Sequence, residues 1–71
     1  MCNRWRIWRW VWNAQEGFFE AFCVSAFAFE DEAHRAFDAV SVPSGSVEIV
    51  ELWHDGEKVR AKNANGEVEV F

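Results

Sequence analysis

Two dipeptides near the C-terminus, Asp55-Gly56 and Asn65-Gly66, constrain the fold more than any other feature of this sequence. Both are typical of two-residue hairpin loops of type I′, because the two loop positions need a positive φ that glycine, asparagine and aspartate tolerate. Apolar and polar residues alternate on either side of each dipeptide, as in half-buried strands. The C-terminal third of the chain is therefore predicted to form a three-stranded antiparallel meander.

The two loops also predict how these strands pair. They place small and branched apolar side chains on one face and set opposite charges across from one another on the other face. A shift of one residue would scramble both faces, so the pattern favours this register. The apolar set is Val50, Leu52, Val59, Ala61, Val68 and Val70, and the charged pairs are Glu51 with Arg60 and Lys62 with Glu69.

The segment RWRIWRWVW, residues 4–12, contains four of the five tryptophans and three of the five arginines. Asn13 and Gly17 follow it, and they are typical of a type I turn closed by a glycine in the left-handed conformation. The segment is therefore predicted to be the first strand of a hairpin. Its expected faces are Trp8, Trp10 and Trp12 with Phe18, Phe22 and Val24, and Trp5, Ile7 and Val11 with Phe19 and Cys23.

Residues 18–40 allow a second interpretation. Apolar side chains recur at helical spacing from Phe18 to Val40, and Asn13 with Glu16 could form a capping box for one long helix. Gly17, the modest helix propensity of phenylalanine and the rarity of so long a helix in a small domain oppose it. The sequence therefore favours a strand after the turn.

Both interpretations agree on a helix from about Glu30 to Val40. Acidic residues fill its first turn, where the helix dipole favours negative charge. Pro43 and Gly45 end the helix, so the order of elements is β-β-α-β-β-β. The predicted buried stripe is Phe29, Ala33, Ala36, Phe37 and Val40, and the predicted outward residues are His34, Arg35 and Asp38.

The predicted fold is one compact α+β domain over residues 1–71, with a single antiparallel sheet and one helix packed on one face. One helix covers only one face of a sheet, yet both faces of the first hairpin carry large apolar side chains. Tryptophans left uncovered would form an apolar patch on the order of several hundred Å², a size that usually marks an interface. Three outcomes remain open: a strongly curled sheet that buries both faces, a homodimer through the aromatic sheet face or its edge, or a foreign protein partner.

Charge and composition narrow the class of partner. The net charge is −5, and residues 10–71 carry four basic and twelve acidic side chains, a net charge of −8. Such a body repels nucleic acid and attracts basic protein surfaces. No stretch of the sequence is typical of a membrane span or of a signal peptide, and two cysteines are too few for a disulfide framework, so a cytoplasmic location is expected. Membrane-active peptides also combine tryptophan and arginine, but an acidic folded domain does not favour that role.

Groups for catalysis are sparse. His34 and His54 are the two histidines, and no Ser, Cys or Asp stands near either in a recognisable nucleophile motif. Together with Cys2 and Cys23 they lack the short ligand pair of a zinc site. A chain this short is also expected to lack the walls of a small-molecule cavity of roughly 300 Å³ or more. We therefore expect no catalytic residue, no cofactor and no metal, and a protein that is not an enzyme.

Two sets of residues are candidates for binding a protein partner. The aromatic set is Trp5, Trp8, Trp10 and Trp53, and the acidic helix set is Glu30, Asp31, Glu32 and Asp38. An acidic surface of this kind could imitate phosphates toward a nucleic-acid-binding protein. The alternatives are a nucleic-acid-binding module that uses Arg4, Arg6, Trp5 and Trp8, since aromatic and cationic groups can stack on bases and contact phosphates, and a self-associating structural domain.

The order β-β-α-β-β-β, ending in DGEKVRAKNANGEVEVF, resembles the layout of some small anti-CRISPR proteins from phages and mobile elements. The resemblance covers the whole chain but lies in element order and turn placement, so no functional residue carries over by motif. It implies a non-enzymatic inhibitor that binds a CRISPR effector protein and blocks access to target DNA.

Overall fold

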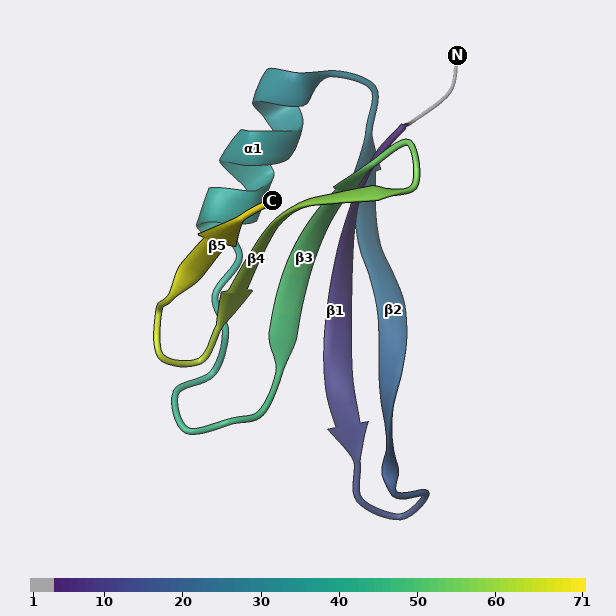
Figure 1. Ribbon diagram of the computed structural model, residues 1–71, viewed down its shortest axis with the longest axis vertical. Coiled ribbons are helices and arrows are strands. Elements are labelled where there is room, and N and C mark those ends of the chain that lie inside the picture. The colour runs from purple at the N-terminus through teal and green to yellow at the C-terminus, as the bar shows by residue number, and fades with distance from the viewer. Residues whose placement is uncertain (1–3) are drawn as a thin grey trace.

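The computed structural model describes residues 4–71, which form five strands and one helix, with the strands in one antiparallel sheet of order β2-β1-β3-β4-β5 (Figure 1). The elements are β1 (Trp5–Asn13), β2 (Phe18–Phe27), α1 (Glu30–Ala39), β3 (Ile49–His54), β4 (Glu57–Asn63) and β5 (Val68–Val70). The predicted α+β order is confirmed, and residues 18–27 form a strand rather than the start of a long helix. Cys2, considered above as a metal ligand, lies outside the described residues.

The turn between β1 and β2 is built around Asn13. Its Oδ1 accepts hydrogen bonds from the backbone N–H groups of Gln15 and Glu16, both at 3.0 Å, and its carbonyl accepts one from Gly17 at 2.8 Å. Gly17 has a φ of 74°, in the left-handed region that strains other residues. The predicted turn from Asn13 to Gly17 is confirmed.

The two later turns differ in how well they match their predictions. Asp55 and Gly56 have φ values of 50° and 81°, as a type I′ loop requires. The last turn is longer than predicted, because Asn63 N–H donates to the Glu67 carbonyl at 3.2 Å and Gly66 N–H donates to the Asn63 carbonyl at 3.1 Å. The Asn65-Gly66 pair therefore belongs to a wider loop, which shifts the pairing of β5.

Two β-bulges also change the predicted registers. Val24 is an extra residue in β2, where the partner of Ile7 is Ser25 but the partner of Trp8 is Cys23. Val59 is an extra residue in β4, because Leu52 pairs with Arg60 but Trp53 pairs with Lys58. Since each bulge shifts the pairing by one residue, it exchanges the faces of the side chains beyond it.

These shifts overturn the predicted charge pairs of the meander. The observed partners are Glu51 with Ala61, Leu52 with Arg60, and Lys62 with Val68. Glu51 therefore does not face Arg60, and Lys62 does not face Glu69. Val68 and Val70 pair with Lys62 and Arg60, so they share a face with Val50 and Leu52 as predicted, but both valines are exposed.

The first hairpin keeps Trp8, Trp10 and Trp12 on one face, as predicted, but its second strand is shifted. Their partners across the strand pair are Cys23, Ala21 and Phe19 in that order. The predicted partners Phe18, Phe22 and Val24 are therefore wrong. The shift follows from the four residues between the paired Asn13 and Phe18, and it places small side chains beside two of the indoles.

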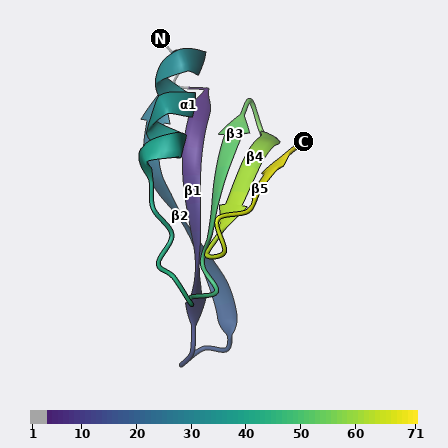
Figure 2. The ribbon, with the colours of Figure 1, turned by 90° about the vertical axis from the view of Figure 1, so that its left-hand side faces the viewer.

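The core lies between α1 and one face of the sheet. Its buried residues are Trp5, Ile7, Ala33, Phe37, Val50 and Leu52. Phe27, Ala36, Val40, Val42 and Val59 pack against this cluster. Figure 2 shows α1 and the loop after it along one side of the sheet, with the other side uncovered.

Helix α1 matches its predicted bounds but not its whole predicted pattern. Phe29, expected in the buried stripe, is the N-cap residue and is exposed. His34, expected to point outward, is partly buried, with its ring centroid 5.4 Å from that of Trp5 and its Nδ1 3.2 Å from Arg60 Nη1. The helix therefore uses His34 as well as Ala33 and Phe37 to reach the sheet.

Two cations of β4 complete the packing around Phe37. The guanidinium of Arg60 and the ammonium of Lys62 lie over its ring, at 4.6 Å and 4.7 Å from the centroid. Lys62 also donates a hydrogen bond to the Phe37 carbonyl. Burial lowers the pKa of Lys62, and the charges of Arg60 and Arg9 lower it further, whereas Asp38 raises it. The register shift thus places charged residues where the sequence predicts Val59 and Ala61.

Candidate functional site

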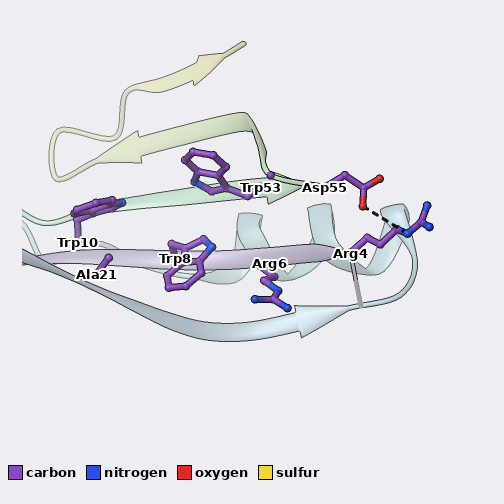
Figure 3. Close-up of a pocket in the computed structure, with 8 residues that line it drawn as sticks. Arg4, Arg6, Trp8, Trp10, Ala21, Trp53 and Asp55 are labelled. Carbon is purple, nitrogen blue, oxygen red and sulfur yellow. Dashed lines mark ion pairs between the residues drawn. The ribbon is translucent and has the colours of Figure 1, made fainter. Parts of the chain in front are cut away.

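The face of the sheet opposite α1 holds an open groove with a volume of about 620 Å³ (Figure 3). Strands β1, β2 and β3 and the β3–β4 loop line it with Arg4, Arg6, Trp8, Trp10, Ala21, Trp53, Asp55 and Gly56. A chain this short was expected to lack the walls of a deep cavity. The groove is an open trough along the face of a sheet, so it does not contradict that expectation.

Strand geometry explains which side chains reach the groove. Successive side chains of a strand point to opposite faces, so Arg6, Trp8 and Trp10 of β1 share the open face while Trp5 and Ile7 point toward α1. Figure 3 shows the three groove residues of β1 in front of the sheet, with the ribbon of α1 behind it.

Neighbouring strands then shape the groove. Trp53 of β3 lies directly opposite Arg6. On the other side, β2 places only small residues beside the large ones, with Ala26, Cys23 and Ala21 opposite Arg6, Trp8 and Trp10. Because the side chains of β1 are large and those of β2 are small, the indoles of Trp8 and Trp10 form one side of the groove.

A buried carboxylate orients two of the indoles. Glu51 is only 8% exposed, and its Oε1 accepts hydrogen bonds from Nε1 of Trp10 at 2.7 Å and Nε1 of Trp53 at 3.0 Å. Its other oxygen, Oε2, lies 3.4 Å from Nζ of Lys58. Because both indole N–H groups are satisfied within the chain, Trp10 and Trp53 offer mainly apolar ring surface to a ligand.

The groove carries positive charge at one end. Arg4 Nε lies 3.5 Å from Asp55 Oδ1. Both side chains are largely exposed, so this ion pair contributes little to the stability of the fold. Arg6 is exposed, and within residues 4–71 its guanidinium forms no ion pair. The charge of Glu51 is already matched by Lys58. Arg6 is therefore the charged group that a ligand in the groove would have to satisfy.

The structure divides the predicted aromatic set. Trp8, Trp10 and Trp53 come together in the groove, and each is half-buried. Trp5 is 8% exposed and lies in the core, where its ring stacks on His54 at a centroid distance of 4.1 Å. A partner at the groove therefore has access to the first three tryptophans and not to Trp5.

The predicted acidic set lies on α1, on the other side of the sheet. Glu30, Asp31 and Glu32 are exposed in the first turn. Asp38 accepts a hydrogen bond from Arg60 Nη2 at 2.9 Å. The acidic and aromatic sets thus form two separate surfaces, and Asp38 is partly neutralised within the chain.

Sequence reasoning missed Glu51, Ala21 and the role of Lys58. One signal was present, because Glu51 and Trp53 are two residues apart in a strand and must share a face. No feature of the sequence indicates that Trp10 contacts Glu51, because this contact depends on the pairing of β1 with β3, which are far apart in the chain.

Within residues 4–71, no group of three or more His, Cys, Asp or Glu side chains is placed to hold a metal ion. No helix in that part of the chain is long and apolar enough to cross a membrane. No protein-family model, no curated protein and no solved structure matches this chain.

Proposed function

We propose that this protein is a non-enzymatic binding domain that docks on a larger protein through the groove on the open face of its sheet. The observation that carries the proposal is the row of Trp8, Trp10 and Trp53, with an arginine at one end, on a face that α1 leaves uncovered. Tryptophan and arginine are the residues most enriched among those that dominate binding energy at protein interfaces. Glu51 holds two of these indoles in place, which reduces the entropy lost on binding.

Nucleic acid is the second candidate, supported by arginines beside indoles in one groove. The net charge of −5 opposes it, and the groove offers only Arg6 as a cation without an ion pair among the described residues. Binding to a polynucleotide gains most from several phosphate contacts, which this surface does not supply. A protein partner fits the charge of the chain better.

The resemblance to anti-CRISPR inhibitors extends the proposal to a class of partner, and it stays a prediction. The exposed acidic turn of α1, with Glu30, Asp31 and Glu32, supports it, since negative charge is attracted to the basic surfaces of nucleic-acid-binding proteins. In that case the groove and the acidic turn would contact a partner from opposite sides of the sheet.

The experiment that tests the proposal begins with capture of a partner from a lysate of the natural host. The complex is then rebuilt from purified components, and its affinity is measured for wild type, Trp53→Ala and Arg35→Ala. We expect Trp53→Ala to weaken the complex by about thirtyfold, the effect of losing about 2 kcal/mol at an interface anchor. Arg35 is exposed on α1, so its replacement should leave the affinity unchanged.

A circular dichroism spectrum of each variant shows whether it remains folded. An unchanged affinity for folded Trp53→Ala would contradict docking through the groove. Tight binding of an oligonucleotide at low salt, with affinity falling steeply as salt rises, would favour the nucleic-acid candidate instead.

A further inference from the structure

We infer that the occupant of the groove is an extended peptide segment of the partner, with one acidic side chain and, to one side of it along the peptide, apolar side chains at alternate positions. This inference rests on the proposed function and adds the chemistry of the partner to it. Three features of the groove support the inference. An arginine lies at one end, a row of indoles lies beside the arginine, and the other charged groups of the groove already have partners within the chain.

The positive end of the groove requires an anion. Arg6 lies directly opposite Trp53 across the β1–β3 pair and two residues before Trp8 on the same face. A ligand that covers these two indoles and the neighbouring guanidinium of Arg6 (Figure 3) would remove water from that guanidinium. A buried charge without a partner is costly, so the ligand should bring a carboxylate to Arg6. An arginine and a carboxylate can form two parallel hydrogen bonds.

The remainder of the groove does not demand a second charge. Glu51 is matched by Lys58 and by the indole N–H groups of Trp10 and Trp53. Arg4 has Asp55 within 3.5 Å. The surface beyond Arg6 is therefore aromatic and apolar, and it fits uncharged side chains.

The spacing of the alternate side chains of β1 that line the groove fits a peptide in extended conformation. Arg6, Trp8 and Trp10 are alternate residues of β1, so their side chains are about 7 Å apart along the strand. Alternate side chains of an extended peptide have the same spacing. A carboxylate opposite Arg6 would thus place the next two side chains on the same face of the peptide opposite Trp8 and Trp10. The volume of about 620 Å³ lies within the range of about 300–1,000 Å³ for ligand sites.

A single-stranded nucleic acid would satisfy Arg6 with a phosphate and stack on the indoles, but it fits the remaining charges poorly. Its further phosphates would approach Asp55 at the groove edge and a chain of net charge −5. A peptide with one carboxylate avoids this repulsion.

A surface-displayed library of random eight-residue peptides tests the inference directly. The full chain is the target, and selection is repeated with Arg6→Glu and with Trp53→Ala. Wild type should enrich peptides with one acidic residue and apolar residues at alternate positions on one side of it, either before or after it in the sequence. Arg6→Glu should select a basic residue in place of the acidic one, because Arg6 is exposed and its charge can be reversed without disturbing the core.

Synthetic peptides then give the size of the effect. A selected acidic peptide and its copy with lysine at the acidic position are titrated while the indole N–H signals of Trp8, Trp10 and Trp53 are followed by NMR. We expect the acidic peptide to bind wild type at least about fivefold more tightly than its lysine copy, and Arg6→Gln to abolish this preference. Arg35→Ala should preserve it.

Peptides that bind the groove but show no acidic preference would overturn the inference and leave docking through the groove intact. Loss of binding in Trp53→Ala identifies such peptides. A library that yields no peptide sensitive to Trp53→Ala would overturn the inference as well. An oligonucleotide of ten thymidines that shifts the same indole signals more strongly than the acidic peptide would overturn both proposals.

Discussion

At the scale of single residues, Glu51 connects the stability of the sheet to the shape of the groove. Its carboxylate is buried, which is unfavourable without partners, and it meets two indole N–H groups and one ammonium. Hydrogen bonds to an ionised group are stronger than those between neutral groups. The same contacts fix the orientation of Trp10 and Trp53. A change at Glu51 is therefore expected to alter both folding and binding.

The variant Glu51→Leu tests this connection. It leaves the N–H groups of Trp10 and Trp53 and the ammonium of Lys58 without their acceptor, and we expect the free energy of unfolding to fall by about 2–3 kcal/mol. Glu69→Leu is the matched control, since Glu69 is exposed in β5 and forms none of these contacts. Urea unfolding at neutral pH, followed by tryptophan fluorescence, measures both variants. Equal stability of Glu51→Leu and wild type would mean that the bridged indoles add nothing to the fold.

At the scale of elements, the turns were predictable because their residues have local conformational preferences. Asn13, Gly17 and the pair Asp55-Gly56 adopt the predicted turns, and α1 begins at Glu30 as expected. Turn type depends on a few adjacent residues, so the sequence near a turn contains most of the information.

The registers were less predictable, because a bulge depends on packing rather than on a distinctive residue. Val24 and Val59 are ordinary strand residues, yet each is the extra residue of a bulge. Counting outward from the Asp55-Gly56 loop gives the right partners as far as Trp53 and Lys58, and wrong ones from Leu52 and Val59 onward. One displaced residue exchanges the faces of those that follow it, so Ala61 was predicted on the face of Val50 but pairs with Glu51 instead.

The groove was predictable only in part for the same reason. Alternation along β1 correctly separates Trp8 and Trp10 from Ile7. It does not say which of the two faces α1 covers, so Trp5 was included among the candidate partner-binding residues. The place of Trp53 beside Arg6 follows from the pairing of β1 with β3, which no hairpin turn encodes.

The β3–β4 hairpin permits a test of its turn alone. Gly56 has a φ of 81°, and a Cβ added there would meet no heavy atom within 4 Å. Gly56→Ala should therefore reduce the free energy of unfolding by about 1–2 kcal/mol through backbone strain alone. Gly56→Asn should lose less than half as much, because asparagine tolerates the left-handed region. Thermal and urea unfolding of both variants measure the difference, and equal losses would indicate a cause other than backbone conformation.

At the scale of the whole molecule, the first hairpin is longer than the part of the sheet that the core supports. The molecule measures 38 × 24 × 19 Å, and Figure 1 shows the far end of β1 and β2 extending beyond α1 and the remaining strands. The exposed large apolar residues at this end include Trp12, Phe18 and Phe19. β2 is also an edge of the sheet and is 10 residues long, whereas the opposite edge, β5, has 3 residues. The stability of the molecule is therefore expected to fall from the core toward this end.

Native-state hydrogen exchange measures that gradient residue by residue. Amide groups from Trp12 to Phe19 lie beyond the core, so they should open in local fluctuations that leave Ile7 and Leu52 protected. We expect their exchange at low protein concentration to be at least about tenfold faster than that of Ile7 and Leu52, a difference of about 1.4 kcal/mol in opening free energy. Equal protection at both ends would contradict the gradient. Protection of β2 that rises with protein concentration would instead identify a second copy at this edge, since a long apolar edge strand is a template for pairing.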